Sequence, residues 1–222
     1  MPPSGDTRVI GALGARQRNK RRKKSHHSGH TRLELDSHAD TSAFGRNSRF
    51  IYDTGQTVTV EGFNQRSMAL NEVKIGTVAV AYDCPTTFKT YILFHHQSLF
   101  IPSLDIHLVN PFQLRAHGII INEIPLIHID PNHRQPDCHS ILVDDPKLQI
   151  PLSLRGTMSG FTTRIPTTEE IEDREQMNCF HVHMTSEAPW EPHDKTHRRL
   201  EASLREDISS DYDLHVKESR DI

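Results

Sequence analysis

Asp36 is the residue whose sequence setting points most directly to chemistry. It follows a short alternating pattern in which Leu33 and Leu35 flank Glu34, and a run of small polar and methyl side chains comes after it. A carboxylate at the end of a buried strand costs free energy unless it is hydrogen-bonded or used in a reaction. We therefore interpret Asp36 as the candidate reactive carboxylate, held in a tight loop made of Ser37, His38, Ala39, Asp40 and Thr41.

Two blocks of sequence resemble a known family of peptidases. Residues 33–41 resemble the active-site loop of retropepsins, hydrophobic-x-hydrophobic-Asp-Ser/Thr-Gly-Ala-Asp-Thr, with His38 in the place of the glycine. Phe100–Leu104 and His107–Gly118 resemble the end of the copia-type retrotransposon protease. The resemblance covers roughly residues 33 to 127, with a weaker continuation through Ile165.

The resemblance implies an all-β fold, a retropepsin-like closed barrel with one short helix. It implies a homodimer in which each subunit supplies Asp36, and two carboxylates that share a proton hydrolyse a peptide or polyprotein through an activated water. Ser37 would steady Asp36 by a hydroxyl hydrogen bond, and Ala39 to Thr41 would lie beside the substrate backbone. We expect no cofactor, and flap residues within Leu70–Tyr82.

His38 leaves two functions open. Glycine suits this position because it allows a close backbone approach without side-chain bulk, and an imidazole could also hold Asp36 ionised through an ion pair. The chain is therefore either an aspartic endopeptidase of retrotransposon polyprotein origin, or an inactive descendant that binds a peptide or nucleic acid as an interaction module.

Two further sequence features could in principle form a site. Asp53-Thr54-Gly55 is a literal Asp-Thr-Gly, but it lies only 17 positions after Asp36, so we interpret it as a β-turn with glycine at positive φ. The chain holds 16 histidines, yet no Cys or His pairs have the spacing of a structural zinc site, and we expect no metal. Two trios alternate as strand residues do: Asp36, His38 and Asp40, and Cys179, His181 and His183. We expect His95 and His96 at the surface.

Short β-branched and aromatic runs predict strands around Leu33, at 57–60, at 73–82 and at 88–94, and a final β stretch that follows residues 119–121 and runs through 126–129. We expect a further apolar piece, 149–154 and 157–165, to return to the body of the domain. Residues 131–138 resemble a loop. A two-turn helix is predicted at 110–118, where Asn110 caps the start, Pro111 suits the first turn and Gly118 ends it. Phe112 and Ala116 should share its buried face, with Leu114 pointing elsewhere.

These elements define a domain at 32–165 between two charged tails. The first 34 residues carry nine Lys or Arg and two acids, whereas residues 166–222 carry fifteen acids and seven bases. We interpret 1–31 as a disordered basic arm and 166–222 as an acidic, partly disordered tail. The arm serves either as a solvated linker, as a nuclear import signal or as a grip on RNA or DNA through Lys20, Arg21, Arg22, Lys23 and Lys24.

The three cysteines, Cys84, Cys138 and Cys179, are too few and too widely spaced for a disulfide framework. The mean hydropathy is -0.59, and no apolar run has the length of a membrane span or of a signal peptide. We therefore expect an intracellular protein, cytoplasmic or nuclear, that makes no membrane contact.

Overall fold

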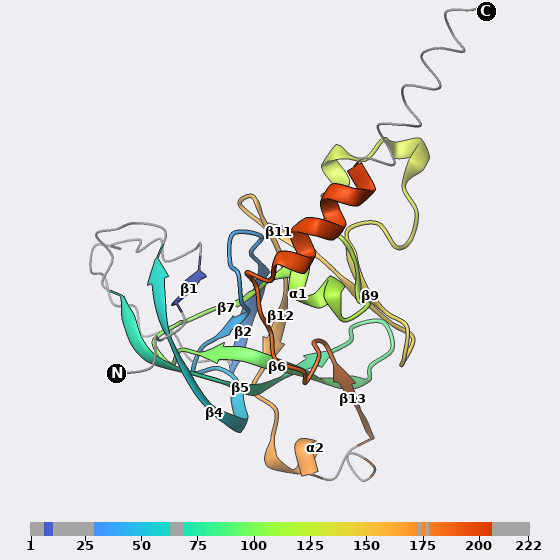
Figure 1. Cartoon of the computed structure of the whole chain (residues 1–222). Helices are drawn as coiled ribbons and strands as arrows, with labels where there is room; N and C mark the ends of the chain where they lie inside the picture. The colour runs from blue at the N-terminus through green and yellow to red at the C-terminus, as the bar shows by residue number, and fades with distance from the viewer. Residues whose placement is uncertain (1–6, 11–28, 63–68, 173–174, 176–177, 206–222) are drawn as a thin grey trace, which may run out of the picture. The chain divides into compact units, whose positions relative to one another are not determined.

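The computed structural model describes residues 7–10, 29–62, 69–172, 175 and 178–205 (Figure 1). Among the described residues strands hold 46% and helices 17%, so the predicted mostly β class is confirmed. The strands are β1 (Thr7–Ile10), β2 (His30–Leu35), β3 (Ala43–Phe44), β4 (Arg49–Gly62), β5 (Leu70–Asp83), β6 (Thr90–Phe100), β7 (His107–Val109), β8 (Ile120–Asn122), β9 (Ser140–Val143), β10 (Leu148–Pro151), β11 (Ser153–Arg155), β12 (Met158–Arg164) and β13 (Cys179–His183).

Most strands belong to one 10-stranded sheet, in the order β1-β4-β5-β12-β2-β7-β3-β6-β13, with β11 paired to β12. β5 also pairs with β6 along most of its length, so pairings lead from β5 through β12, β2, β7 and β3 to β6 and back to β5. A separate 3-stranded sheet has the order β10-β9-β8. The β2–β7, β3–β6 and β13–β6 pairs are parallel.

β5 shows how the sequence pattern builds the core. Successive side chains of a strand point to opposite faces, and β5 is buried on both of them. Val78, Val80 and Tyr82 join the main cluster, whereas Ala79 and Ala81 join a smaller one. The main cluster also takes residues from the 3-stranded sheet, which places that sheet against the large one: Ile121, Ile141, Val143, Leu148 and Ile150.

Helix α1 (Pro111–Ala116) confirms the predicted boundary signals. The Asn110 side chain accepts hydrogen bonds from the backbone N–H groups of Phe112 and Gln113, at 2.7 and 3.4 Å, and Gly118 has φ +83°. The predicted buried face was wrong, because Leu114 is 1% exposed while Phe112 is 51% exposed. Leu114 is buried because it packs into the main hydrophobic cluster. In so short a helix the i, i+4 spacing alone does not predict which face packs against the core.

Three other expectations on the course of the chain differ from the structure. Residues 126–129 were expected in a strand, but Leu126–His128 is the 3₁₀ helix η1, and Pro131–His133 is a second one, η2. β1 lies inside the arm expected to be disordered and pairs with β4. β13 lies beyond the boundary expected at residue 165 and pairs with β6. Helix α2 (Thr168–Glu172) lies between β12 and β13 in sequence. The basic run Lys20–Lys24 lies outside the described residues.

The chain divides into two compact units, residues 1–189 and 190–222. Within the second unit, residues 195–205 form a helix, in which Arg205 Nε lies 3.1 Å from Glu201 Oε1. A helix long and apolar enough to cross a bilayer does not occur among the residues that the structure describes.

Candidate functional site

Asp36 lies where β2 ends against β7. The two strands run parallel, with Leu35 opposite Val109. The Asp36 backbone N–H continues this ladder by donating to the Val109 carbonyl at 2.9 Å. Because α1 begins just after β7, the β2–β7 pairing also fixes the end of β2 to the start of the helix.

The Asp36 carboxylate is enclosed, with only 3% of the residue exposed. Oδ1 accepts a hydrogen bond from the backbone N–H of His38 at 3.0 Å. Oδ2 is buried and has no hydrogen-bond partner among the described residues. A buried carboxylate oxygen without a partner is costly for folding alone, and such groups concentrate at functional sites.

His38 contributes its backbone to the carboxylate and points its ring to solvent. The side chain is 79% exposed, and its Nδ1 lies 3.9 Å from Asp36 Oδ1. His38 is not among the residues with positive φ, so the loop conformation at this position does not require glycine. Ser37 is exposed as well, and the hydrogen bond to the carboxylate comes from the His38 backbone.

A polar network that the sequence did not predict connects the segment after the Asp36 loop to β6 and α1. The Ser42 N–H donates to Gln113 Oε1 at 3.0 Å, and Gln113 Nε2 donates to the Gln97 carbonyl at 3.1 Å. The Ser42 hydroxyl accepts from the Asn110 N–H at 3.1 Å. Gln113 was visible within the motif that resembles the protease ending, but its spacing in sequence gave no sign of which loop it would bind.

The loop residues predicted beside a substrate are largely buried in this structure. Ala39 is 4% and Thr41 is 1% exposed, and the Thr41 hydroxyl has no hydrogen-bond partner among the described residues. Asp40 is half-buried. Asp36, His38 and Asp40 do not form a metal-binding group in the described part of the chain.

Asp53, the alternative Asp-Thr-Gly aspartate, has a different environment. It is exposed and forms an ion pair with Lys74 at 2.8 Å, and this contact together with the Gly55 N–H lowers the pKa of its carboxyl. Gly55 has φ +77° as expected, but the predicted β-turn was wrong: the motif lies in a bulge inside the continuous strand β4. Asp53 therefore stays ionised at the surface.

Two histidines inside the large sheet are buried, which corrects the surface position expected for His95. His95 is 1% exposed, neither ring nitrogen has a hydrogen-bond partner in the described chain, and burial lowers its pKa to about 3. The centroid of its ring lies 4.7 Å from the centroid of the Phe44 ring. His107 packs on the same phenyl ring at 5.2 Å, and burial lowers its pKa to about 4.

His107 binds the segment after β3 through both of its ring nitrogens. Its Nδ1 accepts from the Gly45 N–H at 3.2 Å, and its Nε2 donates to the Asn47 carbonyl at 3.3 Å. A Cβ at Gly45 would lie 2.1 Å from the Leu104 carbonyl oxygen, so no larger residue fits there. The neutral ring of His107 is thus part of the scaffold on which the segment after β3 rests.

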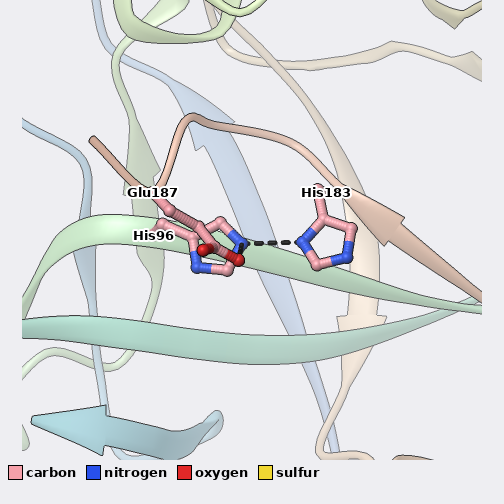
Figure 2. A group of neighbouring side chains, drawn as sticks. All are labelled: His96, His183 and Glu187. Carbon is pink, nitrogen blue, oxygen red and sulfur yellow. Dashed lines mark hydrogen bonds and ion pairs between the residues drawn. The ribbon is translucent and has the colours of Figure 1, made fainter.

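His96 is buried as well, at 6% exposure, and forms the group of side chains that could hold a metal ion (Figure 2). Its Nε2 lies 2.7 Å from His183 Nδ1 and 3.8 Å from Glu187 Oε1. Burial, with His183 nearby, lowers the pKa of His96. Only His183 of the alternating trio takes part, because Cys179 and His181 both bond to the Glu170 carbonyl.

Comparisons with protein-family models, with curated proteins and with solved structures found no match to this chain.

Proposed function

We propose that the chain is a retropepsin-like aspartic endopeptidase that works as a homodimer, with one Asp36 from each copy. The observation that carries the proposal is the setting of this carboxylate: 3% exposed, at the end of a central strand, with Oδ1 bound to its own loop and Oδ2 without a partner. The circuit of pairings from β5 to β6 corresponds, in this proposal, to the closed barrel of the family.

The chemistry follows from pairing two such groups. Two carboxylates a few ångströms apart hold one proton between them, because both cannot ionise at an acceptable cost. The ionised carboxylate removes a proton from a water, and the protonated one donates to the carbonyl oxygen of the scissile peptide. The partnerless Oδ2 is the oxygen available for the shared proton.

Pairing requires the loop to rearrange. Asp36 is enclosed in the single chain, and its loop neighbours Ala39 and Thr41 are buried with it. A second copy reaches the carboxylate only if residues 37–41 move, and the exposed side chains of Ser37 and His38 are the first that it meets. Substrate specificity toward a polyprotein segment or another peptide depends on the same loop.

The deciding test is a peptide-cleavage assay on the purified full chain between pH 5 and pH 7, with its oligomeric state measured by sedimentation. We expect a dimer that cleaves peptides, loses cleavage in Asp36→Asn and retains it in the matched control Asp53→Asn. Cleavage that survives Asp36→Asn, or that disappears in Asp53→Asn, would contradict the proposal. A dimer that never cleaves but binds a peptide would support the interaction module instead.

Substitution of His38 tests the position at which the chain departs from the family. His38→Gly is expected to raise kcat/KM by about tenfold, because it removes an imidazole 3.9 Å from Asp36 Oδ1 that favours the ionised carboxylate when protonated. The measurement is a pH profile of kcat/KM, with the exposed His133→Gly as control, and an unchanged profile would assign His38 no electrostatic role.

A further inference from the structure

We propose that His96, His183 and Glu187 bind a Zn²⁺-class transition-metal ion. The three residues come from three places in the chain: His96 from β6, His183 from the end of β13 and Glu187 from the segment that follows (Figure 2). Their ligand atoms all lie within 4.8 Å of one another. The proposal is independent of the peptidase function, because none of the three residues contacts Asp36 in the interactions described above.

The distances are close to those of a coordinated ion. Two ligands at about 2.0 to 2.2 Å from a tetrahedral zinc lie roughly 3.3 Å apart. The His96 Nε2 to Glu187 Oε1 distance is 3.8 Å and the His96 Nε2 to His183 Nδ1 distance is 2.7 Å. A rotation of the Glu187 side chain, which is 79% exposed, can shorten the first distance. A small shift of the exposed His183 ring must lengthen the second.

The partner of the other His96 nitrogen supports the same assignment. The Thr77 hydroxyl lies 2.9 Å from His96 Nδ1. Metal-binding histidines typically donate their second N–H to a protein oxygen, which fixes the ring and directs the free lone pair at the ion. In the tautomer in which Nδ1–H donates to Thr77, Nε2 of His96 carries the lone pair and faces His183 and Glu187.

The backbone holds the three ligands in place without a metal. The Met184 N–H donates to the Phe94 carbonyl at 2.8 Å, and the Thr185 hydroxyl donates to the His96 carbonyl at 2.9 Å. Gln97 Nε2 donates to the Glu187 carbonyl at 2.9 Å. The backbone that carries the ligands is therefore positioned before an ion binds, whereas the exposed Glu187 side chain still has to be ordered.

The donor set and the surroundings select the class of ion. Two imidazoles and one carboxylate suit zinc and its neighbours, whereas Mg²⁺ and Ca²⁺ prefer oxygen ligands. The ligands line a pocket of about 500 Å³ together with residues of β4 and β5, among them Tyr52 and Thr77. Three protein ligands at such a pocket leave the fourth position to water or to a small ligand.

The test is a zinc titration of the full chain after removal of bound metal with a chelator, followed by calorimetry and thermal unfolding. We expect one site whose saturation raises Tm by about 5 to 10 °C, with no comparable effect of Mg²⁺. Glu187→Gln and His183→Asn should weaken this site at least tenfold, and Thr77→Val about tenfold. The exposed His133→Asn serves as the matched control and should bind as the wild type does.

Each remaining outcome has a definite meaning. Co²⁺ bound at the same site should give the intense visible bands of a tetrahedral complex, and these should disappear in Glu187→Gln. Because Glu187 is exposed, this variant folds even if the buried His96 tolerates no change. Zinc binding that is equal in wild type, Glu187→Gln and His183→Asn, or that is absent from the wild type, would overturn the proposal.

Discussion

Replacement of Asp36 by asparagine is expected to lower kcat for peptide cleavage by at least about a thousandfold, because the dyad then loses both its base and its shared proton. The fold should be retained. Asparagine has the same shape, its Oδ1 can still accept from the His38 N–H, and its Nδ2 replaces a buried oxygen that has no partner in the wild type either. Urea unfolding should therefore show a free energy of unfolding no lower than that of the wild type.

A mixing experiment separates a shared site from two independent ones. When wild-type chain is allowed to exchange with an equal amount of Asp36→Asn, random pairing leaves about one quarter of the dimers with both aspartates. The cleavage rate of the mixture should then be about one quarter of the rate of wild-type protein at the same total chain concentration. A fall to about one half would show that each chain is active alone, and the homodimeric dyad would be wrong. Asp53→Asn mixed in the same way should cause no loss.

Acidification from pH 7 to pH 5 is expected to lower the free energy of unfolding by about 4 kcal/mol through His95 and His107. In the unfolded chain these imidazoles take up protons near pH 6.5, whereas in the folded chain they do so only near pH 3 and pH 4. The unfolded state therefore binds more protons throughout the range from pH 6.5 to pH 4. Their contribution is fully present above pH 6.5 and is lost progressively as the pH falls through this range.

His95→Phe should remove about half of this acid sensitivity. His95 forms no hydrogen bond through either nitrogen and lies against Phe44, so an apolar ring loses nothing and escapes protonation. The variant is expected to gain about 1 to 3 kcal/mol at pH 7 as well, since an unsatisfied buried polar group is removed. Urea unfolding at pH 7 and pH 5 measures both effects, and His95→Leu provides a smaller replacement if phenylalanine overfills the site.

His133→Phe is the matched control, because His133 is exposed. This variant should show the same change in the free energy of unfolding between pH 7 and pH 5 as the wild type. An identical pH dependence of the free energy of unfolding in wild type and His95→Phe would show that His95 is not the group that titrates.

The acid sensitivity of the fold also bears on enzyme assays, because a lower cleavage rate at pH 5 can come from loss of folded protein. Cleavage rates between pH 5 and pH 7 should therefore be normalised to the folded fraction.

The sequence was sufficient for features whose cause is local. The cap at Asn110, the glycine end at Gly118 and the strand around Leu33 each depend on residues a few positions apart, and the structure has all three. The alternation within that strand was not found, because Glu34 is buried together with Leu33 and Leu35. The position of Asp36 at the end of β2 was predicted for the same reason. The retropepsin-like dyad remains a prediction, because it depends on a second chain.

Features set by contacts distant in sequence were missed. His95 and His96 are polar by type, and their burial comes from their place inside β6, where both faces of the strand are covered. β13 lies in an acidic region with few aliphatic residues, and pairing with β6 makes it a strand. The His96, His183 and Glu187 group spans about ninety positions, so no local spacing could reveal it.

The parallel pairing of β13 with β6 sets a limit on where this protein can be shortened. Residues 179–183 occupy the hydrogen-bonding side of Thr90–Phe94, a segment buried almost throughout. A recombinant fragment that stops at residue 165 would leave that side unpaired, and an unpaired apolar strand invites association with other chains. Insolubility of such a fragment would be a property of the cut, and it would carry no information about the intact protein.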